Sequence, residues 1–483
     1  MADDLDARMS AAADLLEALV ADRGLLAGVD AALRERLLIA AGRVSRPTSP
    51  ERRRLARERR KQAKRQVRKQ TEALLSQTGI RKLRENPIFQ TPRRQAGEAL
   101  PPPVGTLPEA RTCYCCQEKY TEVHFFYDHM CLACGDLNYR KRDPAVDLSG
   151  RVALVTGARL KIGYQAAIML LRNGCAVHVL TRFPRDAARR YAAEDDADQW
   201  LDRLQIHGID LRHTPSVEGL CARLLATEER LDFLINNACQ TVRRPAGFYG
   251  HLMALETGDV AQLTDREQSI LAETHAIAVE GEAPSSAQLA ATRLTDEDHH
   301  AGGALFPAGR FDADLQQVDL RDINSWRLRM HEVGTVELLE TQLVNAVAPY
   351  LLNARLKPLM ACVPTNDAHI VNVSAMEGQF YRTFKSPRHP HTNMAKAALN
   401  MMTRTAALDY IEAGIHMNSV DTGWVTDEDP AAHAERKRAE HRFHPPLDIV
   451  DGAARIVDPI FDGIGTGNHV WGQFLKDYKP TDW

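Results

Sequence analysis

Apolar residues follow two different periods along the 483-residue chain. Between Leu5 and Leu38 they recur at helical spacing, which predicts two short amphipathic helices that end before Arg46-Pro47. From Asp147 onward, short apolar runs alternate with segments of helical period, a pattern typical of a parallel sheet covered by helices on both faces. We therefore expect an α/β fold with a doubly wound parallel sheet over residues 147–483 and a helical segment over residues 1–45.

Seven apolar runs are the predicted strands of this sheet. In chain order they are Arg151–Gly157, Cys175–Arg182, Leu204–Asp210, Leu231–Asn236, Ile370–Ser374, Ile415–Val420 and His469–Phe474. Ligands of a doubly wound sheet bind beyond the carboxyl ends of its strands, so the residues that follow these runs are the first candidates for a site.

Charge is unevenly distributed along the chain. The net charge of -3 and the isoelectric point near 6.7 predict no overall attraction to nucleic acid or membranes. However, Arg52–Lys69 holds eleven basic residues and one acidic residue, which predicts an exposed basic helix. This helix is either a spacer or oligomerisation arm or a contact for nucleic acid or an acidic partner, and its lack of aromatic residues argues against nucleic acid. With the stiff Pro101–Pro103 linker it makes up a second segment, residues 46–110.

Two Cys-x2-Cys pairs separated by fourteen residues lie in the next segment, residues 111–142; they consist of Cys113, Cys116, Cys131 and Cys134. Four thiolates at this spacing can occupy the corners of a tetrahedron, which predicts a closed, structural Zn(II) site. Cys115 is the expected bystander, and His124 or His129 is the substitute ligand if one cysteine is misassigned. Reduced thiols in a packed loop are the alternative, but they would not explain the paired spacing.

The cellular compartment is inferred from the cysteines and from the start of the chain. The nine cysteines are an odd number and cluster in one segment, which indicates a reducing environment. The first residues are acidic, unlike the basic flank of a secretory signal. No apolar run approaches the roughly 18 residues that a membrane span needs. We therefore expect a soluble, cytoplasmic protein without membrane contact.

The stretch Arg151–Gly163, RVALVTGARLKIG, predicts a strand, a tight turn and a helix. Such a unit presents backbone N–H groups at a helix N-terminus, where the helix dipole favours a phosphate and glycine permits close approach. Lys161 stands where a three-glycine dinucleotide motif would carry glycine. An ordinary buried strand and turn is therefore the alternative interpretation.

Further motifs follow this turn in a fixed order. They are Asp210 after the third run, Asn236-Asn237-Ala238-Cys239 after the fourth, then Asn345, Ser374, Lys396 and Asp421-Thr422-Gly423. Together with the turn they resemble the short-chain dehydrogenase/reductase family over about Asp147–Trp483. The resemblance implies a Rossmann domain, a nicotinamide dinucleotide, a small-molecule substrate and assembly into a homo-oligomer.

The resemblance also implies roles for single residues. Ser374, Lys396 and Asn345 match the family's catalytic positions. The implied cofactor contacts are Gly157, Arg159, Lys161, Ile162, Gly163, Asp210, Asn237, Ala238, Lys396, Thr422 and Gly423. Lys161 is similar to the basic residue of the pteridine-reductase-like branch, whereas Cys239 replaces a glycine and Thr422 a proline of the family pattern.

The cofactor preference can be argued from the end of the second predicted strand. Enzymes that bind the plain ribose hydroxyl usually carry an acid there, and this chain has Arg182. An arginine fork suits a 2'-phosphate, and Lys161 would add a second positive charge. The sequence favours NADP over NAD, with a surface-loop charge as the alternative role for Arg182.

One position contradicts the catalytic pattern of the family. The general acid/base of the family is a tyrosine four residues before the lysine, and this chain has Thr392 there. An aliphatic hydroxyl is too weak an acid to replace a phenol, so Tyr381 and His391 are the alternative proton donors. Two hypotheses follow: an NADP-dependent oxidoreductase acting on a carbonyl, alcohol or imine, and a catalytically silent NADP-binding scaffold or regulatory module.

Residues 243–337 are much longer than the family needs at this point and are interpreted as an insertion at the ligand end of the sheet. Its apolar anchors are Phe248, Leu305, Phe306, Phe311 and Trp326. They predict a lid or a surface for a protein partner rather than disorder. The pair His299-His300 is interpreted as surface residues, not as metal ligands.

Overall fold

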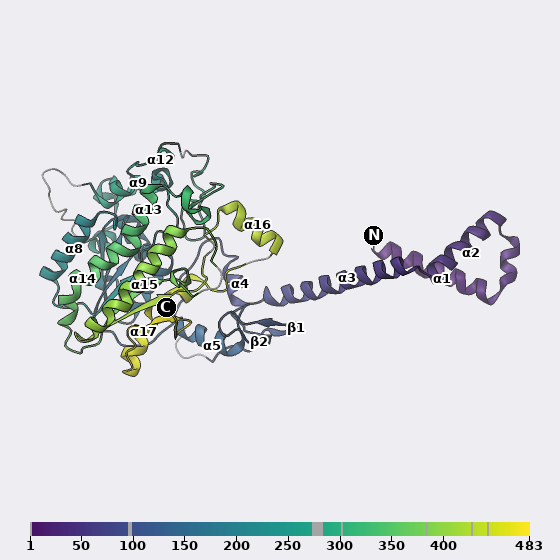
Figure 1. Ribbon diagram of the computed structural model, residues 1–483, viewed down its shortest axis with the longest axis horizontal. Helices are drawn as coiled ribbons and strands as arrows, with labels where there is room; N and C mark the ends of the chain where they lie inside the picture. The colour runs from purple at the N-terminus through teal and green to yellow at the C-terminus, as the bar shows by residue number, and fades with distance from the viewer. Residues whose placement is uncertain are drawn as a thin grey trace. The chain divides into compact units, whose positions relative to one another are not determined.

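Two units make up the chain, Met1–Glu72 and Ala73–Trp483. The computed structural model describes residues 2–94, 99–272, 284–300, 303–381, 385–426, 428–441 and 444–483. Figure 1 draws the chain from its purple N-terminus to its yellow C-terminus. Each unit is described by itself.

The first unit is entirely helical. It contains α1 (Ala2–Ala21), α2 (Ala31–Ser45) and most of α3 (Ser49–Leu75). The Asp30 carboxylate begins α2 by accepting hydrogen bonds from the N–H groups of Ala32 and Leu33. The predicted N-terminal helices are therefore confirmed, and the basic side chains of Arg52–Lys69 lie exposed along α3.

The second unit is built on an eight-stranded sheet in the order β10-β9-β8-β7-β6-β3-β4-β5. All neighbouring strands are parallel except β9 and β10. The strands are β3 (Val152–Thr156), β4 (Ala176–Thr181), β5 (Leu204–Gly208), β6 (Phe233–Asn236), β7 (Ala368–Ser374), β8 (Ile415–Asp421), β9 (Phe474–Lys476) and β10 (Lys479–Thr481). The doubly wound α/β fold predicted from the apolar runs is confirmed.

Helices cover both faces of this sheet (Figure 1). Along β3, Ala153 and Val155 belong to one hydrophobic core and Leu154 to the other, because successive side chains of a strand point to opposite faces. The first core includes α6 (Lys161–Arg172) and α17 (Ile449–Thr466). The second includes α8 (Thr214–Thr227), α14 (Ala348–Ala361) and α15 (Pro390–Ile411).

The last predicted strand, His469–Phe474, begins five residues before the observed strand β9. Residues 469–473 precede β9, which begins at Phe474. Gly472 has a φ of +63°, which interrupts the extended conformation before the strand. Asp477 and Tyr478, both with positive φ, then form the turn into β10.

A small module precedes the sheet in the chain. It consists of the antiparallel pair β1 (Gly105–Thr112) and β2 (Lys119–Val123), followed by α5 (Leu132–Lys141). Arg142 fixes it to the start of α17 through ion pairs of 2.7 Å with the carboxylates of Asp448 and Asp451.

The insertion forms short helices with a core of their own. They are α9 (Gly250–Thr257), α10 (Asp265–Ser269), α11 (Ser286–Ala290) and α12 (Asp296–His300). Phe248 and Phe306 are buried in a cluster that also contains Phe183 of the sheet domain, and Leu305 packs against it. Phe311 is 41% exposed, so it is a weaker anchor than predicted.

Four further α-helices of the second unit are α4 (Gly79–Leu83), α7 (Pro184–Ala192), α13 (Thr335–Gln342) and α16 (Ala431–His441). In the part of the chain that the structure describes, no helix has the length and apolar character required to cross a bilayer.

Candidate functional site

The turn between β3 and α6 is joined to the end of β6. The Asn237 side-chain amide donates hydrogen bonds to the carbonyl oxygens of Thr156 (3.0 Å) and Gly157 (3.2 Å). The Ala238 N–H donates to Thr156 Oγ1 at 2.9 Å. Gly157 has a φ of +67°, and a Cβ added there would lie 2.8 Å from Ala238 Cα. Glycine is therefore required at the turn, which brings two predicted cofactor motifs together.

Gly163, in the first turn of α6, makes an equally close contact. A Cβ added at Gly163 would lie 2.3 Å from Asn237 Nδ2 and 2.6 Å from the Gly157 carbonyl oxygen. Helix α6 can therefore begin directly behind the turn. Lys161 opens this helix with a φ of +57°, and Ile162 follows it beside Gly452 of α17.

Three cations predicted to bind the cofactor already contact protein groups. Arg159 Nη1 lies 2.5 Å from an oxygen of Asp186, and Lys161 Nζ lies 3.8 Å from an oxygen of Asp314 in the insertion. Arg182 Nη2 donates a hydrogen bond of 2.8 Å to the Tyr249 hydroxyl, and its guanidinium group lies 4.8 Å from the centre of the Tyr249 ring.

The insertion also places a carboxylate on the first turn of α7, just after Arg182. Glu256 accepts hydrogen bonds from the backbone N–H groups of Arg185 (3.2 Å) and Asp186 (2.9 Å). Burial outweighs these hydrogen bonds and raises the pKa of Glu256 to about 7. The sequence analysis missed this residue because nothing in the spacing of the insertion shows that α9 packs against α7.

Asp210, one of the predicted cofactor contacts, is buried two residues after β5 and is paired with Arg212. Arg212 Nε lies 3.0 Å and 3.1 Å from the two carboxylate oxygens of Asp210. Burial opposes ionisation of Asp210, but the Arg212 contacts outweigh it and lower its pKa. Arg212 Nη1 also lies 2.7 Å from an oxygen of Glu340.

The predicted catalytic residue Lys396 reaches the end of β7, beside Ser374. Lys396 Nζ donates a hydrogen bond of 2.7 Å to the carbonyl oxygen of Val373, the residue before Ser374. Thr392 lies one helical turn before Lys396 on the same face of α15. Among the described residues, the buried hydroxyl oxygens of Ser374 and Thr392 have no hydrogen-bond partner.

Asn345 lies in a π-helical turn, Leu343–Val347, between α13 and α14. Its side-chain oxygen accepts a hydrogen bond of 2.7 Å from the Gln240 N–H, and its amide group donates one of 3.1 Å to the Gln240 carbonyl oxygen. Asn345 therefore holds the segment that follows Asn237-Ala238.

The two alternative proton donors lie in different surroundings. Tyr381 is 51% exposed, whereas His391 is buried with its Nε2 atom 3.7 Å from an oxygen of Glu337. Trp326, near the end of the insertion, stacks on His389 at a ring distance of 3.9 Å. The insertion therefore contacts the start of α15, and the roles of Tyr381 and His391 stay predictions.

Asp421 is a titratable residue beside Ser374, and the sequence named it only as the first residue of a motif, without a role as an acid or base. The two residues are register partners at the ends of β7 and β8. Burial raises the pKa of Asp421 to about 6, although Lys476 on β9 lowers it. The sequence feature that could have identified Asp421 as a candidate is a carboxylate at the end of an otherwise apolar or neutral strand. Thr422 and Gly423, with a φ of +77° at Gly423, follow directly.

The four predicted metal ligands come together. The sulfur atoms of Cys113, Cys116, Cys131 and Cys134 all lie within 4.8 Å of one another. Cys116 and Cys131 are 3.8 Å apart, and the Cys131 N–H donates a hydrogen bond of 3.4 Å to Cys113 Sγ. Tetrahedral zinc–thiolate bonds of about 2.3 Å place sulfur atoms about 3.8 Å apart, so this cluster can hold a zinc ion.

The neighbouring candidates for the metal site have other partners. Cys115 Sγ lies 3.6 Å from an oxygen of Asp477 and is outside the cluster. The Nδ1 atom of His124 accepts hydrogen bonds from the N–H groups of Phe126 and Tyr127. His129 Nδ1 lies 2.7 Å from an oxygen of Asp128.

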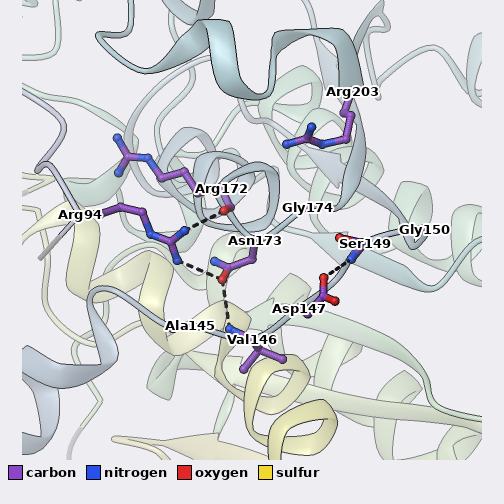
Figure 2. A pocket seen from close by; sticks show the side chains of 10 residues that line it. All are labelled: Arg94, Ala145, Val146, Asp147, Ser149, Gly150, Arg172, Asn173, Gly174 and Arg203. Carbon is purple, nitrogen blue, oxygen red and sulfur yellow. Dashed lines mark hydrogen bonds between the residues drawn. The ribbon is translucent and has the colours of Figure 1, made fainter. Parts of the chain in front are cut away.

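A pocket of about 650 Å³ lies at the opposite, amino-terminal ends of β3, β4 and β5, where Ser149 and Gly174 are part of its lining (Figure 2). Arg94 donates hydrogen bonds from its guanidinium group to the carbonyl oxygen of Arg172 and to Asn173 Oδ1. Protein groups thus accept hydrogen bonds from Arg94 in this pocket.

Two protein-family models match parts of the chain. The short chain dehydrogenase family model matches residues 151–251, and the Enoyl-(Acyl carrier protein) reductase model matches residues 323–447. Residues 252–322, which lie between the two matches, belong to the insertion.

Two curated proteins illustrate the similarity. An uncharacterized protein of Acanthamoeba polyphaga mimivirus is 30% identical over 367 residues, which cover 73% of this chain and 71% of that protein. A short-chain dehydrogenase/reductase of Pyricularia grisea is 29% identical over 202 residues, which cover 38% of this chain and 81% of that protein.

Two solved structures are similar over a large part of the chain. The carbonyl reductase Sniffer of D. melanogaster has 18% identity and a TM-score of 0.43, covering 69% of this chain and 100% of its own. A short-chain dehydrogenase/reductase from Burkholderia multivorans with bound NADP has 17% identity and a TM-score of 0.41, covering 69% of this chain and 99% of its own.

Proposed function

The chain belongs to the short-chain dehydrogenase/reductase family, and on this basis we propose that it is an NADP-dependent oxidoreductase. It would transfer hydride between the cofactor and a carbonyl, alcohol or imine substrate. The observation that carries the proposal is the hydrogen bond from Lys396 Nζ to the Val373 carbonyl oxygen, beside the buried hydroxyl of Ser374.

The residues at the nicotinamide end fit such a cofactor. Within the described part of the chain, the hydroxyl oxygens of Ser374 and Thr392 have no protein partner, so both can bind a ligand. Lys396 would hold the nicotinamide ribose, and Asn237 and Ala238 would support the wall of the site. The turn from Gly157 to Gly163 would take the pyrophosphate at the start of α6.

The residues at the adenine end also fit NADP, but two protein carboxylates act against binding of its 2'-phosphate. Arg182 uses one N–H group on the neutral Tyr249 hydroxyl, and a guanidinium group has five. Its remaining N–H groups and Lys161 would bind a 2'-phosphate. The Glu256 carboxylate on the first turn of α7 opposes an anion there, and Asp314 competes for Lys161.

The bound cofactor would supply the hydride, and the protein has to supply or accept a proton. The Ser374 hydroxyl would donate a hydrogen bond to the substrate oxygen and orient it. Thr392 is too weak an acid to deliver the proton. Asp421 is titratable and is the register partner of Ser374 at the ends of β7 and β8. We therefore assign the role of proton donor and acceptor to its carboxyl group. Tyr381 and His391 remain the alternative donors.

The second candidate function is a catalytically silent NADP-binding module, and Thr392 is the observation that favours it. In this case the four-cysteine module, the exposed basic face of α3 and the insertion would recruit partners. Binding of nucleic acid by α3 would weaken steeply as salt increases, whereas a spacer would show no such binding.

Turnover separates the two functions. The full chain would be incubated with NADPH and a panel of ketones, aldehydes and imines, and NADPH oxidation would be followed by absorbance. We expect oxidation that falls at least a hundredfold in Lys396→Ala. Lys357→Ala is the matched control, because Lys357 is a half-buried residue of α14 that pairs with Asp409. NADPH binding without oxidation by any substrate, unchanged in Lys396→Ala, would support the silent module instead.

We further propose that the four cysteines hold a structural zinc ion. All four corners of the tetrahedron come from the protein, which is typical of structural rather than catalytic zinc. The buried apolar residues of the module, among them Val123, Tyr127 and Met130, belong to the core that it shares with the sheet domain, and the ion would add to the stability of the module.

A further inference from the structure

Three histidines meet at the amino-terminal ends of β7 and β8. The cofactor turn lies at the opposite, carboxyl-terminal ends of the strands. His369 is the second residue of β7, His416 is the second residue of β8, and the two are register partners. His469 comes from the segment between α17 and β9. One ring nitrogen from each histidine lies within 4.8 Å of the other two.

We propose that His369, His416 and His469 bind a divalent first-row metal ion, with zinc as the expected ion. Imidazole nitrogen is a suitable ligand for zinc, copper and nickel. Three histidines and one open position make up a recognised zinc coordination set. The site is separate from the four cysteines and does not depend on the oxidoreductase function proposed above.

The orientation of His416 leaves one nitrogen available for an ion. Its Nδ1 atom lies 3.3 Å from the carbonyl oxygen of Ala368. Because a carbonyl oxygen can only accept, this contact places the proton on Nδ1 and the lone pair on Nε2. Histidine ligands commonly donate their second N–H to a backbone carbonyl in this way, which fixes the ring.

The other two rings face each other through the nitrogens that would bind the ion. His369 Nε2 and His469 Nδ1 are 2.9 Å apart. His369 is fully buried, and its Nδ1 atom has no hydrogen-bond partner among the residues that the structure describes. If His369 binds the ion through Nε2, its ring proton lies on Nδ1.

The surrounding residues make room for this cluster. A Cβ added at Gly463 of α17 would lie 2.6 Å from His469 Nδ1 and 3.1 Å from His369 Nε2. Glycine at position 463 is therefore needed for the two rings to face each other beneath the helix. His469 is half-buried, so its side of the cluster is open to solvent and offers a path for an ion and for a water molecule as the fourth ligand.

A carboxylate next to the cluster would act on the ion through its charge. Asp367 precedes β7 and accepts hydrogen bonds of 2.8 and 2.7 Å from the two terminal nitrogens of Arg151. These contacts hold the carboxylate of Asp367, so we do not count it as a direct ligand.

Binding would require a small movement of the His469 segment. Zinc–nitrogen bonds of about 2.0–2.1 Å at tetrahedral angles place ligand nitrogens about 3.3–3.4 Å apart. The pair at 2.9 Å would have to separate by about 0.4 Å. The segment between Gly467 and Gly472 can supply this movement because it has no regular secondary structure. A bound ion would then tie it to the starts of β7 and β8.

The test is the zinc content of the full chain, produced without a polyhistidine tag. Protein equilibrated with buffered free zinc would be freed of loosely bound metal, and its zinc would be counted by mass spectrometry. We expect two zinc ions per chain in the natural protein and one in His469→Gln and in His416→Gln. His207→Gln is the matched control and should keep two, since His207 makes a buried histidine pair with His178 at 3.0 Å, with no third histidine joining it among the residues that the structure describes.

A second measurement guards against variants that fail to fold. With the cysteine site already filled, added zinc should raise the melting temperature of the natural protein, and His469→Gln should lose this increase while keeping its circular dichroism spectrum. His469 lies on a half-buried loop, so this substitution is expected to leave the fold intact. Equal zinc content and an equal thermal shift in the natural protein and His469→Gln would overturn the proposal.

Discussion

The hydroxyl oxygen of Tyr114 accepts a hydrogen bond of 2.9 Å from the backbone N–H of Trp424. Tyr114 lies between two cysteines of the small module, and Trp424 directly follows Gly423 after β8. A Cβ added at Gly423 would lie 3.1 Å from the Tyr114 hydroxyl, and Lys476 Nζ lies 5.4 Å from the centre of the Tyr114 ring. The four-cysteine module therefore positions the loop that carries the predicted cofactor contacts Thr422 and Gly423.

Loss of this hydrogen bond should weaken both the fold and cofactor binding. Tyr114→Phe removes the acceptor and should lower the free energy of unfolding by about 1 kcal/mol. Because the loop after β8 loses its anchor, we expect the Kd for NADPH to rise about three- to tenfold, as measured by calorimetry. Tyr120→Phe is the control: the Tyr120 hydroxyl donates to the Asp128 carbonyl oxygen inside the module and does not reach the loop. An equal rise in both variants would mean that the effect is general destabilisation.

Substitution of one metal ligand should release zinc, whereas substitution of the neighbouring cysteine should not. In Cys116→Ser we expect the zinc of this site to be lost and the melting temperature to fall by several degrees, because the module depends on the ion. Cys115→Ser should keep the zinc, since Cys115 Sγ points to Asp477 instead. Release can be followed with a chromogenic chelator. Zinc loss in Cys115→Ser but not in Cys116→Ser would contradict the ligand set.

The affinity for NADP should depend on pH through Glu256. Its pKa is raised to about 7 by burial, so the carboxyl group is neutral below pH 7 and negatively charged above it. The negative form would repel a 2'-phosphate at the first turn of α7, and we expect the Kd for NADP to rise as pH increases through 7.

Glu256→Gln should remove most of this dependence and should leave NAD binding nearly unchanged. The titration of the phosphate itself, with a pKa of about 6, remains in the variant and can be subtracted. Glu267→Gln is the control, because Glu267 also accepts a backbone hydrogen bond at a helix start in the insertion, from Thr264. A pH profile that is the same in the natural protein and in Glu256→Gln would exclude this role for Glu256.

The ionised form of Asp421 should lower the free energy of unfolding above pH 6, although the same residue is proposed to support turnover. Burial raises its pKa from 3.8 to about 6, so the folded protein binds this proton more tightly than the unfolded chain does. The stabilising contribution is complete below about pH 4 and is lost as pH rises through 6, on the order of 2–3 kcal/mol in total.

Asp421→Asn cannot ionise, so we expect a higher free energy of unfolding than the natural protein at pH 8 and a smaller difference at pH 4, measured by urea unfolding. If Asp421 carries the proton, turnover should fall at least tenfold in the same variant. Unchanged turnover together with increased stability would leave Asp421 a buried structural residue and would direct attention to His391 and Tyr381.

The fold class could be predicted from the sequence because periodicity is a local property. Apolar runs such as Val152–Thr156 predict strands buried on both faces, and their alternation with helix-period segments predicts a doubly wound sheet. The spacing of Cys113, Cys116, Cys131 and Cys134 was also sufficient to predict that their sulfur atoms meet, since two short knuckles bring each pair together locally. The family pattern further predicted which residues lie at the ends of the strands.

Which residues from distant parts of the chain share those ends depends on tertiary packing, and the sequence did not show it. Glu256 and Tyr249 reach α7 and Arg182 because the insertion folds back onto the sheet, and no local pattern encodes this packing. Asp421 lies beside Ser374, and His369 beside His416, because β7 and β8 pair in one particular register. Register is set by packing over the whole sheet. The charges and ligands around the site therefore followed from the three-dimensional arrangement, whereas the strands that present them followed from the sequence.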